Sequence, residues 1–174
     1  MQTRWLAQAG VLLVIAAVGA PAQYPEIGLG WMPEFSLATR QIKELAEAIP
    51  ADKYSWRPAP GVRSVSEVLM HVALGNFYLL DQAGGKIPDD TPDIHPDFEK
   101  KITAKADVLF WLDKSAKAVK QVYPAVDRSK KIKFLGKDTT SDAVFLRILV
   151  HSHEHMGQMI AYARLLGVTP PWSK

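Results

Sequence analysis

The sequence predicts an all-α fold, an antiparallel four-helix bundle preceded by an N-terminal signal peptide. Four long segments repeat apolar residues every three or four positions, which is the spacing of one face of an α-helix. Each of these segments stops at a proline or a glycine. No segment shows the sustained alternation of apolar and polar residues that predicts a half-buried strand. Four amphipathic helices of this length pack most simply as an antiparallel bundle.

The first two helices have clear boundary signals. The apolar pattern of the first covers residues 34–49 and stops at Pro50. The second is expected to begin at Ser64, because Ser64 and Glu67 have the spacing of a capping box, in which each side chain bonds the other residue's backbone N–H. It is expected to end at the glycines 84–85.

The third and fourth helices fill the second half of the chain. Apolar residues recur at helical spacing over 97–122, which predicts the third helix. The polar segment that follows could include a short extended piece at 132–136. The fourth helix is expected to start at Thr140 or Ser141, either of which is a suitable N-cap, and to continue to Leu166.

The N-terminus has the three parts of a secretory signal. A short start containing Arg4 precedes an apolar run over 11–18, and small residues follow up to Ala22. The apolar run is shorter than the roughly 20 residues that span a bilayer. We therefore expect a signal peptide over 1–22, no stable membrane anchor, and an exported protein whose single domain covers 23–174.

Composition narrows the possible partners and ligands. The chain has no cysteine, so it has no disulfide and no thiolate ligand, and any metal must be held by histidine or carboxylate side chains. Its 21 basic and 18 acidic side chains give a net charge of only +3, with no long basic block. This balance gives little reason to expect nucleic acid as a partner, and a small molecule is the simpler expectation.

Three of the five histidines lie in "HSHEHMGQM", residues 151–159. Successive residues of a helix rotate by about 100°, so His151 and His155 share a face whereas His153 points elsewhere. Apolar residues continue the face of the pair in both directions, so we expect it to look into the bundle, where two imidazoles one turn apart can chelate a metal ion. Alternatively, the two rings only hydrogen-bond to each other, although burying both without a ligand costs desolvation of their nitrogens. His153 is interpreted as a packed or interfacial residue.

A metal centre of this kind usually has a third protein ligand, which has to come from upstream. His71, in the middle of the second predicted helix and one turn before Gly75, is the first candidate. His95, in a loop rich in proline and aspartate, is the second. The stretch also fits H-x-x-E-H with Glu154 as a base, the inverted zinc-protease motif, but no acidic residue follows Glu154 to complete such a site.

Two motifs connect these observations. In "WRPAPGVRSVSEVLMHVA" (56–73) a Trp-x-Pro turn precedes a helix with one histidine, and in "HSHEHMGQ" (151–158) an H-x-x-x-H pair is followed by x-G-Q. In this order and at this separation they resemble the DinB/YfiT-like metal-binding four-helix bundles, over roughly residues 33–172.

The resemblance implies that His71, His151 and His155 form a three-histidine site for a divalent transition metal such as zinc, nickel or manganese. The chain differs from many relatives at Glu154, where a further histidine is common, and at Met156, where a basic residue is common.

The first functional hypothesis is an exported metal-dependent enzyme. The resemblance implies hydrolase-like reactions or transfer of low-molecular-weight thiols to electrophiles, and export favours hydrolysis. Gln158, one turn after His155, and Glu154 are candidates for assisting groups; the alternatives are a buried packing amide and an ordinary ion-paired glutamate.

The second hypothesis is a non-catalytic exported protein that binds a small ligand or uses the metal as a structural element. Relatives of this kind are often dimers, so a homodimer is possible, with Val119 and its neighbours as one candidate for the shared face.

Overall fold

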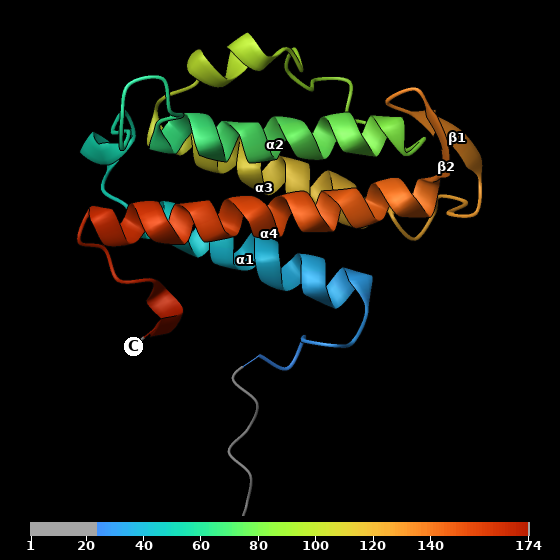
Figure 1. Cartoon of the computed structure of the whole chain (residues 1–174), viewed down its shortest axis with the longest axis horizontal. Coiled ribbons are helices and arrows are strands. Elements are labelled where there is room, and N and C mark those ends of the chain that lie inside the picture. Colours follow the sequence, from blue (N-terminus) through green and yellow to red (C-terminus); the bar gives the residue numbers. More distant parts are fainter. Residues whose placement is uncertain (1–23, 174) are drawn as a thin grey trace, which may run out of the picture.

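The computed structural model describes residues 24–173, so the predicted signal peptide lies outside the described residues. Within the described part, four α-helices confirm the all-α class (Figure 1). They are α1 (Trp31–Ala48), α2 (Val65–Gln82), α3 (Lys105–Val122) and α4 (Ser141–Leu165). Two short strands, β1 (Lys131–Phe134) and β2 (Lys137–Thr140), precede α4, and three short 3₁₀ helices cover 51–53, 96–100 and 171–173. No helix among the described residues is long and apolar enough to span a membrane.

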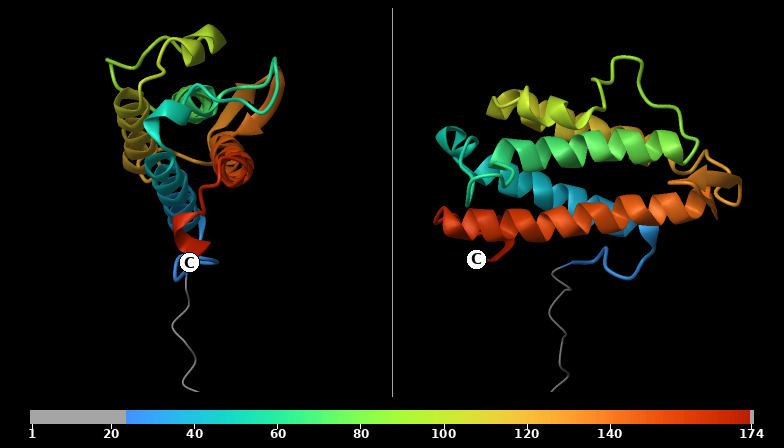
Figure 2. Two further views of the ribbon diagram at one scale, coloured as in Figure 1. Left: turned by 90° about the vertical axis from the view of Figure 1, so that its left-hand side faces the viewer. Right: turned by 45° about the horizontal axis from the view of Figure 1, so that its top comes forward.

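The helices are not all antiparallel to their neighbours, which corrects the prediction. Helix α2 packs between α3 and α4, and α1 packs against the same two helices from the other side (Figure 2). Ser141 at the start of α4 bonds Ala83 after the end of α2, so these two helices are antiparallel. Trp31 at the start of α1 bonds Phe145 in the first turns of α4, so that pair is parallel. Helices α2 and α3 are also parallel, with Gly85 beside Val122 at their ends.

The parallel pair is produced by the connection over 83–104. Helix α2 is about 27 Å long at 1.5 Å per residue, and the connection runs back over this length before α3 begins. Bundles with such a crossover connection pack by the same rules as those with short loops, so the apolar pattern of the helices does not specify the direction of α3. A consequence is that residues 96–100 lie over the first half of α2.

The predicted helix caps are confirmed. Ser64 and Glu67 form both halves of a capping box at the start of α2. The Thr140 hydroxyl accepts from the Ala143 N–H at the start of α4. These contacts satisfy backbone donors that have no partner within the helix, and so they fix where α2 and α4 begin.

Two helix boundaries differ from the prediction. Helix α1 starts at Trp31, three residues early, and tolerates Pro33 because N–H groups in a first turn lack a helical partner in any case. The expected helix over 97–122 is two elements, a 3₁₀ helix over Pro96–Lys100 and then α3 from Lys105. Phe98 and Ile102 both pack on the core from outside α3, so their spacing imitates helical periodicity.

The extended piece predicted at 132–136 is one arm of a hairpin. Strand β1 pairs antiparallel with β2, with Phe134 opposite Lys137. The turn residues Leu135 and Gly136 both have positive φ, 49° and 77°, as a tight two-residue hairpin turn requires. The usual signal for this turn is Asn-Gly or Asp-Gly, and the leucine conceals it.

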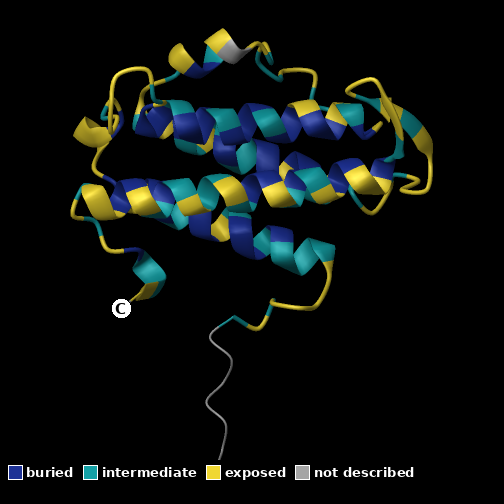
Figure 3. Cartoon of the chain, viewed as in Figure 1, coloured by how far each residue is buried: buried dark blue, intermediate teal, exposed yellow. Residues whose placement is uncertain are grey.

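The core runs the length of the bundle between the four helices, and its buried residues face inward (Figure 3). Val119 is fully buried in this core, against side chains of the same chain, rather than on an exposed face. The α2–α4 interface contains the histidines identified in the sequence.

Candidate metal centre

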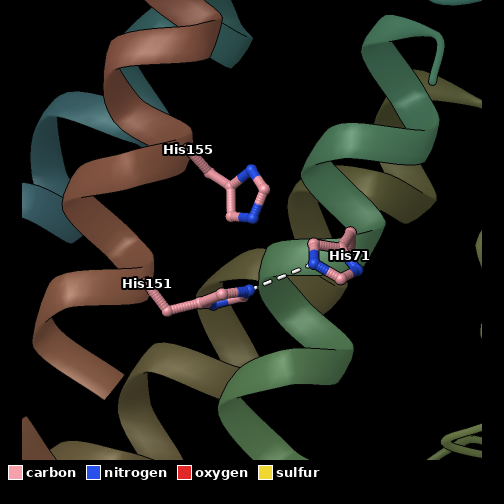
Figure 4. Close-up of side chains that lie close together, drawn as sticks. All are labelled: His71, His151 and His155. Atoms are coloured by element: carbon pink, nitrogen blue, oxygen red, sulfur yellow. Dashed lines mark hydrogen bonds between the residues drawn. The ribbon is translucent and has the colours of Figure 1, made fainter. Parts of the chain in front are cut away.

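His71 projects from α2 toward His151 and His155 on α4 (Figure 4). One ring nitrogen of each residue lies within 4.8 Å of the others. The one-turn spacing of His151 and His155 places both rings on the inner face of α4, as predicted, with their centroids 4.5 Å apart. The His71 ring meets them at centroid distances of 5.0 and 4.7 Å.

The close approach of the two helices depends on Gly75. A Cβ at this position would lie 2.5 Å from Cε1 of His151, closer than real Cβ contacts occur. The ring of His151 therefore occupies the space in which any other residue at position 75 would place its side chain. Gly75 lies one turn after His71 on α2, so the glycine and His71 are adjacent on the same helix face.

His151 has one nitrogen directed at His71 and one that lacks a partner in the described part of the chain. The residue is 8% exposed, and its Nε2 lies 3.1 Å from Nε2 of His71. Its Nδ1 has no hydrogen-bond partner among the described residues. Nitrogens bound to one tetrahedral zinc at about 2.0–2.1 Å lie roughly 3.3 Å apart, so the Nε2 pair is already at ligand spacing.

His71 is oriented by a carboxylate. Its Nδ1 lies 2.5 Å from Oε1 of Glu99, so Nδ1 donates and Nε2 keeps its lone pair toward the other two histidines. Arg63 holds Glu99 in turn, with Nε 2.6 Å from Oε2. A histidine fixed by a carboxylate on its outer nitrogen is the usual arrangement in protein metal sites, because this partner sets the tautomer and increases the basicity of the ligand.

His155 is oriented by a second chain of hydrogen bonds. Its Nδ1 donates to Oε1 of Gln158 at 2.9 Å, which leaves Nε2 free to face the centre. Gln158 donates through Nε2 to the Tyr162 hydroxyl, and this hydroxyl donates to the backbone carbonyl of Arg63. The hydrogen bonds that start at His71 and those that start at His155 therefore both end at Arg63, the first at its side chain and the second at its backbone carbonyl.

Burial keeps two of the imidazoles neutral. Desolvation, with smaller contributions from His155 and His71, lowers the pKa of His151 to about 3. Desolvation also lowers the pKa of His155, although the hydrogen bond to Gln158 opposes it. Burial alone would raise the pKa of Glu99, but hydrogen bonds from His71 and Arg63 outweigh it and bring this pKa below its ordinary value. Neutral imidazoles beside an ionised carboxylate are the protonation states that a metal site requires.

The other residues singled out in the sequence lie elsewhere. His95 is exposed and caps the 3₁₀ helix at Asp97. His153 is partly buried and outside the three-histidine group. Glu154 is exposed on α4 and forms an ion pair with Arg147, so it takes the role of an ordinary ion-paired glutamate. Gln158 is the one assisting candidate that contacts a histidine of the group.

Sequence reasoning missed Glu99, Arg63 and Tyr162 as parts of the site. Glu99 fell inside a predicted helix and belongs to no motif, and only the crossover connection brings it to His71. Tyr162 was recognisable from its position, one turn after Gln158 on the inner face of α4. Arg63 lies within the 56–73 motif, but the sequence does not indicate its role, which depends on contacts with residues far along the chain.

An open pocket of about 590 Å³ adjoins the centre. Glu99 and Gln158, which hold the outer nitrogens of His71 and His155, are part of its wall. The rest of the lining comes from the turn before α2, the first turns of α2 and the 3₁₀ helix, and comprises Arg57, Gly61, Val62, Arg63, Glu67, Asp97 and Lys100. Its volume lies in the range of about 300–1,000 Å³ that is usual for small-molecule sites.

Fold and site together define a class of protein, a four-helix bundle with three convergent histidines between two of its helices. The family model of the DinB superfamily matches residues 34–159, and the chain belongs to this superfamily. The recognition made from the two motifs is therefore confirmed. No protein with a curated description matches the sequence.

Two solved structures have the same fold. A DinB-like protein from Bacillus cereus ATCC 10987 aligns with a TM-score of 0.67 at 17% identity, over 82% of this chain and 95% of that one. The DinB-like protein YjoA from Bacillus subtilis aligns with a TM-score of 0.59 at 22% identity, over 80% and 92% of the two chains.

Replacing Gly75 with alanine should weaken metal binding at least tenfold, because the added Cβ displaces the ring of His151. Competition with a chromogenic chelator measures this affinity. Gly157→Ala is the matched control, since Gly157 is also helical but a Cβ there meets nothing within 4 Å. Parent-like affinity in Gly75→Ala would contradict the proposed role of this glycine.

Glu99→Ala should lower metal affinity about ten- to hundredfold, the usual loss when the outer partner of a ligating histidine is removed. Glu99→Gln should be intermediate, because its amide oxygen can still accept from His71. Glu154→Ala removes an exposed acid that contacts Arg147 and should leave the affinity unchanged. Equal losses of metal affinity in Glu154→Ala and Glu99→Ala would show that the affinity depends on the overall negative charge near the site and not on the contact between Glu99 and His71.

The metal-free protein should lose stability as the pH falls below about 6.5. In this range the unfolded chain protonates residue 151 at its ordinary pKa of 6.5, whereas the folded protein resists protonation down to about 3. A histidine whose pKa is lowered by folding reduces the free energy of unfolding by up to about 1.4 kcal/mol for each unit by which the pH falls in this range. Urea denaturation in chelator at pH 7.5, 6.5 and 5.5 measures the slope, and His151→Gln should flatten it. Identical slopes in both proteins would refute this assignment.

Proposed function

We propose that this protein is a metal-dependent enzyme that binds one divalent transition metal through His71, His151 and His155 and acts on a small molecule. The convergence of three histidines, two of them held on their outer nitrogens by Glu99 and Gln158, carries this proposal. Three imidazoles leave coordination positions open, as catalytic sites do, whereas structural sites are usually closed by four protein ligands.

Zinc, nickel and manganese are the candidate ions. Imidazole donors suit zinc and nickel well, and the absence of cysteine from the chain disfavours ions that need soft thiolate ligands. Three neutral ligands leave the charge of the cation uncompensated. When bound, a divalent ion supplies Lewis acidity and makes a water or thiol nucleophile available at neutral pH.

The residues around the histidines have roles that follow from their contacts. Glu99 and Gln158 fix the tautomers of His71 and His155, so both rings present Nε2 without reorganisation. The open pocket beside them is where a small-molecule substrate would bind. We propose hydrolysis or thiol transfer as the reaction class, with hydrolysis first if the signal peptide directs export. A homodimer remains part of the proposal.

The alternative is a non-catalytic protein in which the metal is a structural element. The core along the bundle argues against this structural role, because α2 and α4 pack through apolar residues on both sides of the histidines without needing a cation to join them.

Metal content and thermal unfolding separate these two functions. We expect about one equivalent of transition metal by plasma mass spectrometry in the parent, and its loss in His71→Ala and His155→Ala. Chelation should abolish turnover of a panel of esters, amides and thiol conjugates while leaving a folded bundle. Collapse of the fold on chelation would favour the structural role, and a parent that cannot be loaded with metal would refute both.

A further inference from the structure

The pocket beside the histidines contains two arginines with a common arrangement. Arg57 pairs with Glu67, and Arg63 pairs with Glu99. The side chains of the two acids are only 12% and 8% exposed, whereas those of the two arginines are 40% and 42% exposed. In each pair the carboxylate is therefore the buried partner and the guanidinium is the more exposed one.

Both guanidiniums keep hydrogen-bonding capacity. A guanidinium has five N–H donors in a planar fork. Arg57 uses one to Val62 and one to Glu67, and Arg63 uses its Nε and Nη2 on Glu99. The remaining donors of both residues have no partner among the described residues.

The other charged residues of the pocket leave the two guanidiniums accessible. Lys100 and Asp97 form an exposed pair with each other, at 68% and 67% exposure, so they cancel at the pocket's rim. Both oxygens of Glu67 are already engaged, one by Arg57 and the other by the backbone N–H of Ser64. Glu67 and Glu99 keep their negative charges, but each is the buried member of its pair, so an approaching anion meets the more exposed guanidinium first.

We propose that this pocket binds the oxyanion group of the substrate, a carboxylate or a phosphate, through Arg57 and Arg63. Planar guanidiniums bind these groups with paired hydrogen bonds, which gives orientation as well as affinity. Arg63 also contacts Glu99, which in turn contacts His71. An anion on Arg63 would therefore be separated from the three histidines by the side chain of Glu99. The role of the anion as part of a substrate rests on the proposed function; its binding to the pocket does not.

Isothermal titration calorimetry with succinate, inorganic phosphate and the neutral diamide succinamide tests this proposal. At least one of the two anions should bind at least tenfold more tightly than succinamide. Arg57→Gln should weaken anion binding at least fivefold without changing metal content, because Arg57 contacts neither the histidines nor their partners. Arg57→Lys, which keeps the charge but not the fork, should be intermediate.

Arg40→Gln is the matched control. Arg40 is 45% exposed and paired with acids like Arg57, but it lies on α1 beside a different pocket. Anion binding in this variant should stay within twofold of the parent. An equal loss in both variants, or binding of both succinate and phosphate no tighter than that of succinamide, would overturn the proposal.

Running each titration with and without chelator separates this proposal from that of the metal centre. Anion binding that is lost on chelation but unchanged in Arg57→Gln would place the anion on the metal and overturn the pocket. Anion binding that depends on Arg57 in a protein that takes up no metal would support the pocket and refute the metal-dependent enzyme.

Discussion

The imidazole of His151 occupies the space that a side chain at position 75 would fill. Helices α4 and α2 approach so closely here that there is no room for a Cβ atom at position 75. The same approach places Nε2 of His151 3.1 Å from Nε2 of His71. Protein interiors are packed so closely that adding even one methyl group at such a contact forces the neighbouring side chain to move. The geometry of the three histidines, the burial that keeps His151 neutral, and the fit to a small cation all depend on this contact.

Arg63 joins the hydrogen-bond networks that hold His71 and His155. Its guanidinium holds Glu99 against His71, and its carbonyl accepts from Tyr162, the last member of the chain that begins at His155. Arg63 directly precedes Ser64, the N-cap of α2. The capping box at the start of this helix therefore lies next to Arg63, the residue on which both chains of hydrogen bonds end. In this way the N-terminal cap of α2 also helps to position the residues of the site.

The crossover connection explains why the site has a carboxylate and a pocket. A short loop after α2 would leave the far end of that helix uncovered, whereas residues 83–104 return along it and place a 3₁₀ helix over its first turns. That 3₁₀ helix contributes Glu99 to His71 and three residues to the pocket wall. The parallel arrangement of α2 and α3 is thus part of how this bundle builds a site that opens at one end.

The sequence by itself determined the four helices, the caps at Ser64 and Thr140, and the shared face of His151 and His155, because periodicity and capping are local properties of the chain. It also identified the family from two short motifs. Only the tertiary structure decided the direction of α3, the division of 97–122 into two elements, and the contacts of Glu99 and Arg63. These features depend on residues far apart in the chain, and Phe98 and Ile102 show how two separate packing contacts can imitate one helix. Local patterns fix which residues face inward, whereas the partners they meet there are fixed by the path of the connections.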